Sequence, residues 1–166
     1  MNTFEPEHTG TLITKDYVSE KSQVEIIAGA KGIFAIEVFD QDMQGEPGSD
    51  RKILDVLTRF KVRFVSKDTN ANTITHYVST TLKHVKRVVN TLKETFPNGE
   101  VNTRKVALVS AIGSDMKVPG ILARSVKALA DADISVLALH QCMRQVDIQF
   151  VIDEDQYQAT IVALHA

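Results

Sequence analysis

The sequence repeats with a spacing of about 72 residues, the distance from Pro47 to Pro119, and this repeat restricts the fold more than any other feature. A shift by that distance places Pro47-Gly48 on Pro119-Gly120, and apolar residues fall on apolar residues on both sides. The matched pairs are Leu57 with Leu129, Val62 with Ile134, Phe64 with Val136, Ile74 with Val146, Val78 with Phe150, Val89 with Ile161 and Leu92 with Leu164. Agreement of this length is improbable by chance, so the sequence predicts two copies of one structural unit.

The second copy shows the order of elements most clearly. Alternating apolar residues from Val106 to Ile112 predict a strand, and the apolar stripe that follows Pro119-Gly120 predicts a helix. Apolar segments at 134–139 and 146–152 predict two further strands, and the pattern at 155–165 predicts a last helix. This order is a ferredoxin-like βαββαβ unit that lacks only its closing strand. We therefore predict an α+β fold built from two ferredoxin-like units in tandem.

The first copy is more divergent, but its elements follow the same order. A segment apolar on both faces begins at Ile33 and predicts a central strand. The remaining elements are a polar loop at 40–48, a helix capped by Ser49 or Asp50, a strand at 62–65, a turn at 66–72, a strand at 74–78, a helix at 82–96 and a closing strand at 100–104.

The second unit still needs a closing strand, because an unpaired sheet edge leaves backbone groups without partners. Residues beyond Ala166 or a segment from elsewhere in the chain could supply it. Val24–Ile27 is a short apolar segment that the first unit does not need. We predict that residues 23–28 complete the second sheet and that the glycines at 29–32 form a turn into the first unit. The resulting division is a tail and linker at 1–22, a first module at 32–104, and a second module of 23–28 plus 105–166.

Composition excludes several classes of protein. The chain has 166 residues, is 43% hydrophobic and 24% charged, and carries a net charge of −2. A net charge of −2 does not favour binding to nucleic acid or to an anionic membrane. No apolar run is long enough to span a bilayer. A single cysteine, Cys142, cannot form an internal disulfide, which fits a cytoplasmic protein.

The sequence contains no catalytic constellation. Asp40, Asp42 and Glu46 share one loop, but their spacing does not fit an EF-hand, and a solvated polar loop is the simpler interpretation. The histidines are scattered singly; His76 and His140 could line a pocket, although partly buried structural histidines are more common. We predict neither catalytic residues nor a metal site.

An amino-acid site is the remaining option. The loop at 40–48 leads into a helix N-terminus, whose free N–H groups favour a carboxylate. Asp40 or Asp42 could accept the ammonium group, and the turn at 66–72 is expected to lie beside this loop, since the first two strands are taken as neighbours.

Several stretches of the sequence resemble a known family. The segment SAIGSDMKVPGILARSVKALADADISVLALHQ, followed by VDIQFVIDE and IVALH, is similar to the second ACT domain of aspartate kinases. NTFEPE near the N-terminus, with GT behind it, resembles the end of the aspartokinase catalytic domain. FDQDM and HQCMRQVD resemble the aspartokinases associated with ectoine synthesis.

This resemblance implies a regulatory region that forms a homodimer through its ACT modules and binds an amino-acid effector. The effector-binding residues predicted in this way are Asp40, Gln41, Asp42, Met43, Gly45, Ser66, Asp68, Thr69 and Asn70. The parent enzyme would use ATP and Mg to convert L-aspartate into 4-phospho-L-aspartate, whereas no cofactor and no catalysis are expected of the stretch itself. A free-standing ACT-type amino-acid sensor, a regulatory subunit of another biosynthetic enzyme, and an enzyme on a bare ferredoxin-like fold stay open.

Overall fold

The computed structural model describes residues 23–44, 47–114 and 116–165, so the predicted tail at 1–22 lies outside the described residues. The elements are β1 (Gln23–Phe39), η1 (Gln41–Gln44), α1 (Ser49–Arg59), β2 (Phe64–Thr69), β3 (Thr73–Ser79), α2 (Leu82–Thr95), β4 (Glu100–Ser114), α3 (Ile121–Asp131), β5 (Val136–Gln141), β6 (Asp147–Asp153), η2 (Glu154–Gln156) and α4 (Tyr157–His165). The strands form one antiparallel sheet in the order β2-β3-β1-β4-β6-β5.

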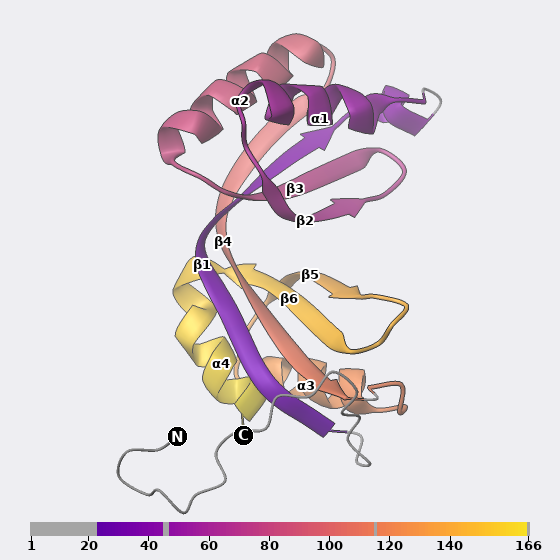
Figure 1. Ribbon diagram of the computed structural model, residues 1–166, viewed down its shortest axis with the longest axis vertical. Coiled ribbons are helices and arrows are strands. Elements are labelled where there is room, and N and C mark those ends of the chain that lie inside the picture. The colour runs from indigo at the N-terminus through magenta and orange to yellow at the C-terminus, as the bar shows by residue number, and fades with distance from the viewer. Residues whose placement is uncertain (1–22, 45–46, 115, 166) are drawn as a thin grey trace, which may run out of the picture.

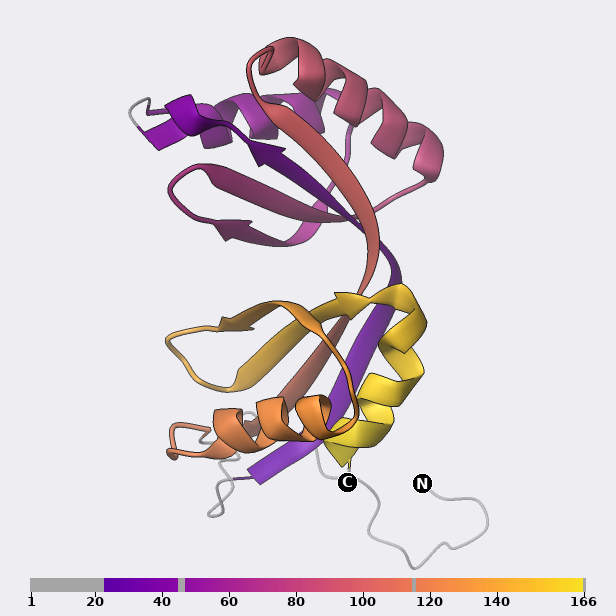
Figure 2. The same cartoon turned by 180° about the vertical axis from the view of Figure 1, so that it is seen from behind.

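Two long strands, β1 and β4, run through both halves of the molecule and bend at its waist (Figure 1). Residues 33–39 of β1 pair with β3 and with the first half of β4 in module one (residues 32–104). Residues 23–30 pair with 108–114 in module two (residues 23–28 plus 105–165), so the strand predicted to complete the second sheet does so. Helices cover the outer face of each module, and the two helix-free faces are turned toward each other (Figures 1 and 2).

The turn predicted at residues 29–32 is wrong, because β1 is continuous through these residues. The register shifts between Ala30 and Ile33, and Gly32 has a φ of 72°. Its N–H donates a hydrogen bond to Oε2 of Glu154 at 2.9 Å. A bulge with one glycine in the left-handed region bends a strand without interrupting the ladder, which is how β1 passes from one module into the other.

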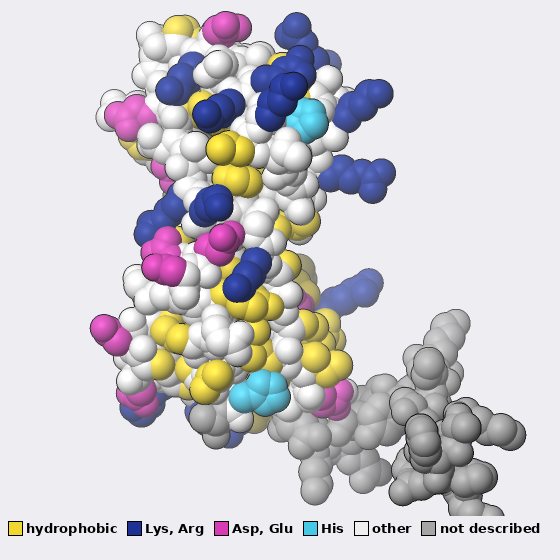
Figure 3. All heavy atoms as spheres, turned by 90° about the vertical axis from the view of Figure 1, so that its left-hand side faces the viewer, with side chains coloured by type: hydrophobic (Ala, Val, Ile, Leu, Met, Phe, Trp, Pro, Cys, Tyr) yellow, Lys and Arg dark blue, Asp and Glu magenta, His cyan; other side chains and the backbone are white. Residues whose placement is uncertain are grey.

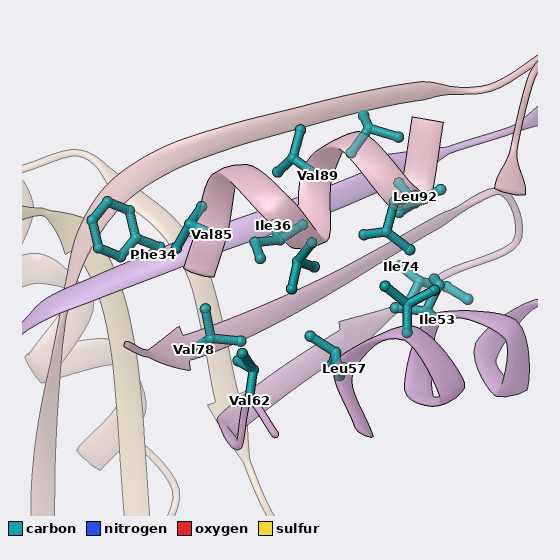
Figure 4. Close-up of a cluster of buried hydrophobic side chains, with 14 of the residues drawn as sticks. Phe34, Ile36, Ile53, Leu57, Val62, Ile74, Val78, Val85, Val89 and Leu92 are labelled. Atoms are coloured by element: carbon teal, nitrogen blue, oxygen red, sulfur yellow. The ribbon is translucent and has the colours of Figure 1, made fainter. Parts of the chain in front are cut away.

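Each module has its own core between helices and sheet, and a third apolar cluster lies at the waist. In module one, Ile36 of β1 and Leu57 of α1 pack with valines and Leu92 of α2 (Figure 4). The waist cluster consists of Ile33, Tyr77, Val106, Leu108 and Val151. It explains why β1 is apolar on both faces, since module two covers the face that the helices leave open.

The repeat shifts register within the structure. The spacing is 72 residues from Ser49 to Ile121 at the start of α1 and α3, but 74 from Thr73 to Asp147 at the start of β3 and β6. The turn between β5 and β6 is longer by these two residues. Matching Val78 with Phe150 is therefore wrong, and the residue of module one that corresponds to Phe150 is His76. His76 pairs with Ile36 of β1, and Phe150 pairs with Val109 at the equivalent position of β4.

The surface differs between the modules. Lysines and arginines project from module one, whereas apolar side chains spread over module two (Figure 3). Part of this apolar surface comes from α4, in which Val162 is 60% exposed. Across the described ranges, no helix combines the length and hydropathy that a membrane-spanning segment requires.

Candidate functional site

The predicted effector loop folds back on itself after β1. The carboxylate of Asp40 accepts a hydrogen bond from the N–H of Asp42 at 3.0 Å. The N–H of Asp40 donates to the carbonyl of Asn72 at 2.9 Å, which ties the loop to the hairpin between β2 and β3. Gln41 and Asp42 are exposed, and Met43 packs against the module-one core. Gly45, which completes the predicted loop set, lies outside the described residues.

The other half of the predicted site is arranged differently from expectation. β2 does not lie beside β1, because β3 is between them. Residues 66–69 belong to β2, and only Asn70 to Asn72 form the turn, where Asn70 Oδ1 accepts hydrogen bonds from backbone N–H groups. Ser66 and Asp68 stand on the helix-free face, since they pair with residues of β3 on that face, whereas Thr69 alternates to the helix side. The structure therefore brings the loop and the turn together but points Asp68 elsewhere.

The N-terminus of α1 has no side-chain cap, so the predicted cap at Ser49 or Asp50 is wrong. Gly48 occupies the cap position with a φ of 104°, a conformation that side chains rarely adopt. Ser49 is already helical and buried. Within the described part of the chain no side chain caps the first N–H groups of α1, and such groups favour an anion.

A cluster that sequence reasoning missed lies beside this helix end. Asp50 of α1 forms an ion pair with Lys67 of β2, and its other oxygen lies 3.7 Å from Nε2 of His76. His76 is fully buried, and neither ring nitrogen has a hydrogen-bond partner within the described part of the chain. Burial lowers the pKa of His76, an effect that the nearby charge of Asp50 opposes and that of Lys67 reinforces. The sequence could have pointed to His76, because aligning the repeats with the 74-residue spacing of their third strands places His76 on Phe150, a core residue of module two.

The lowered pKa predicts a loss of stability in weak acid. Below the ordinary histidine pKa of 6.5 the unfolded chain takes up a proton that buried His76 resists. The free energy of unfolding should therefore fall as the pH drops below this value, by at most about 1.4 kcal/mol per pH unit from this residue, until the folded-state pKa is passed. In urea titrations across this range, His76→Phe should remove this component and exposed His165→Gln should retain it. Identical slopes for the two variants would contradict the assignment.

Asp68 joins the two modules instead of facing the loop. Its Oδ2 accepts a hydrogen bond from the hydroxyl of Tyr77 at 2.5 Å, and its Oδ1 lies 3.3 Å from Nε2 of His140 in module two. Burial, together with the hydrogen bond to Asp68 and its charge, raises the pKa of Tyr77. His140, named in the sequence as a pocket-lining candidate, is half-buried here. Asp68 and His140 occupy equivalent positions of β2 and β5, so equivalent strands of the two modules contact each other here.

No group of three or more His, Cys, Asp and Glu side chains suited to a metal ion occurs in residues 23–44, 47–114 and 116–165. Of the carboxylates considered for a metal, Asp40 is engaged with Asp42, and Glu46 lies outside those ranges. Cys142 is exposed and its thiol lies 3.4 Å from Oδ1 of Asp147, with no histidine recorded against it.

Comparison with known proteins shows which proteins this chain is similar to. Residues 109–166 match the ACT domain profile. The chain is 54% identical to aspartate kinase Ask_Ect of Stutzerimonas stutzeri (strain A1501) over 164 residues, which are 99% of this chain and 34% of that protein. The chain is a homologue of aspartate kinases. A bifunctional aspartokinase/homoserine dehydrogenase of Haemophilus influenzae is also similar, at 26% identity over 99% of this chain and 21% of that protein.

Solved structures show the same fold. The regulatory subunit of aspartate kinase from Thermus flavus superposes with a TM-score of 0.75 at 17% identity, over 86% of this chain and 96% of that one. Aspartate kinase from Clostridium acetobutylicum superposes with a TM-score of 0.81 at 17% identity, over 91% of this chain and 36% of that one. The chain therefore shares the fold of these structures, and it spans about a third of the length of the Stutzerimonas relative.

Proposed function

We propose that this chain is the regulatory region of an aspartate kinase, which would use ATP and Mg to phosphorylate L-aspartate in the cytoplasm. The observation that carries the proposal is the 54% identity to Ask_Ect over 99% of the chain. The similarity to that protein, together with FDQDM and HQCMRQVD, favours a kinase that serves ectoine synthesis. The region itself would bind an effector and hold two copies of the enzyme together.

The effector would bind where the loop after β1 meets α1. The uncapped N-terminus of α1 offers N–H groups to the carboxylate of an amino acid. Asp42 is exposed, and among the described residues its carboxylate has neither a hydrogen-bond partner nor an ion-pair partner, so it can accept the ammonium group. Asp40 would also accept the ammonium group through Oδ2, since its Oδ1 accepts the N–H of Asp42. The cluster of Asp50, Lys67 and buried His76 would fix the helix end from the opposite side.

Isothermal titration calorimetry with lysine, threonine, methionine and ectoine tests this site. We expect saturable heat with one of them, and Asp42→Asn should weaken that binding by about tenfold or more, since a hydrogen bond to a charged group is removed. Asp55→Asn is the matched control, because Asp55 lies on the exposed side of α1, where among the described residues its carboxylate makes a long ion pair with Arg51 and no other. Absence of heat with all four compounds, or equal affinity for Asp42→Asn and the native chain, would refute the site.

A homodimer would form through module one. The apolar second face of β1 does not require a partner, because module two covers it. The support comes instead from β2, which is an edge strand with Phe64 at 42% and Val65 at 53% exposure. Sedimentation should give a dimer at concentrations of roughly tens of micromolar, and Val65→Lys should give a monomer. A native monomer at these concentrations, or a dimeric Val65→Lys variant, would argue against this interface.

A further inference from the structure

The helix-free faces of the two modules line a cavity of about 720 Å³ that is open to solvent on one side. This volume is within the range of small-molecule sites. The cavity lies on the opposite face of the module-one sheet from the effector loop, since Glu37 and Thr75 line it while the intervening residues His76 and Ile36 pack beneath the helices. It is therefore separate from the site proposed above at Asp40, Asp42 and the N-terminus of α1, although Asp68, Thr69 and Asn70 of the predicted effector set line it.

The two walls differ in chemistry. Module one contributes hydroxyl, amide and carboxylate side chains, among them Thr75, Asn102 and Glu37. Module two contributes apolar side chains, among them Leu137 and Val151. A ligand that fills the cavity must have a polar end against module one and an apolar body against module two.

Charge pairing decides the sign of the polar end. Asp68 is occupied by Tyr77 and His140. Arg104 donates through Nε to Asp153 at 2.7 Å and through a second nitrogen to the same carboxylate, so its charge is matched. Glu37 is half-buried, and within the described residues its carboxylate has neither a hydrogen-bond partner nor an ion-pair partner. The cavity thus contains one carboxylate that is not paired.

We propose that this cavity binds a small organic ammonium compound, with its amine at Glu37 and its hydrocarbon body against Leu137 and Val151. In the ladder, Glu37 stands opposite Thr75 on one side and opposite Asn102 on the other. These three side chains offer three oxygens to the three N–H donors of a primary ammonium group. A charge-assisted hydrogen bond in a half-buried site is stronger than one on an open surface.

Methyl NMR titrations with n-butylamine and with sodium butyrate at millimolar concentrations test the proposal. Protonated butylamine should shift the methyl signals of Ala35, Ala138 and Val151, which line the cavity, and should leave Met43 at the effector loop unchanged. Butyrate, with the same hydrocarbon body and the opposite charge, should shift none of the cavity methyls. Because butylamine lacks a carboxylate for the N-terminus of α1, failure here and failure of the effector site are distinguishable.

Three variants complete the experiment. Glu37→Gln should weaken butylamine binding about tenfold or more. Thr75→Lys should abolish binding while preserving a folded spectrum, because a lysine opposite Glu37 supplies a tethered ammonium group. Glu94→Gln on the exposed face of α2 should bind as the native chain does. Equal binding of butyrate, unchanged affinity in Glu37→Gln, or cavity methyls that do not move with butylamine would each overturn the proposal.

Discussion

Removal of residues 1–28 should destabilise module two while module one keeps its slow amide exchange. The deletion takes away the part of β1 that pairs with Ser110–Ser114 of β4, and with it Ile27, which packs against the module-two core. At roughly 1 kcal/mol for each hydrogen bond of the ladder, we expect a loss of at least about 3 kcal/mol. Hydrogen exchange should then quicken about a hundredfold in β5 and β6, and far less in β3.

The matched control is a chain that lacks only residues 1–22 and keeps the whole of β1. It should exchange as the native chain does in β5 and β6. Equal loss of protection in both modules after removal of residues 1–28 would mean that the modules unfold as one unit, and the assignment of this strand to module two would have no energetic meaning.

The pairing of residues 23–28 with module two could be predicted from the sequence, because the second repeat has one strand fewer than the first. An apolar segment at 24–27 precedes the first repeat without a role there. Edge pairing makes this segment a candidate for the strand that the second unit needs. The bulge at Gly32 was not predictable, because two glycines favour a turn as readily as a bent strand. Only the register of β1 on β4 separates these alternatives.

The candidate site was predicted less completely, for a different reason. The loop at 40–43 follows from local sequence, but the neighbours of Asp68 depend on which residue of β3 it opposes. The β2–β3 hairpin has a turn two residues shorter than the β5–β6 hairpin, so a constant repeat spacing misaligns the third strands of the two modules. For the same reason the sequence alignment does not show that His76 corresponds to Phe150. Alternation in a strand sends every side chain to the other face after a slip of one residue, so a site assembled across strands requires the register.

Gly29→Ala should destabilise module two by about 1–3 kcal/mol through overpacking. A Cβ at this position would lie 2.6 Å from Cε2 and 3.0 Å from the hydroxyl of Tyr157, the first residue of α4. It would also lie 3.1 Å from the carbonyl oxygen of Leu108 on the paired strand. Gly29 therefore has no side chain because α4 crosses β1 at this point, and urea denaturation should show the loss.

A double-mutant cycle with Tyr157→Ala separates this steric cause from backbone effects. Removal of the ring should recover at least about 1 kcal/mol of the cost of Gly29→Ala, since contacting positions couple by 0.5–3 kcal/mol. Gly32→Ala is the control: its Cβ would meet nothing within 4 Å, but its φ of 72° is unfavourable for alanine. Its cost of about 1–2 kcal/mol comes from the backbone and should be the same with or without the ring of Tyr157. If Tyr157→Ala lowers the free-energy cost of neither substitution, the close approach of α4 to β1 is not the reason that a glycine is needed at position 29.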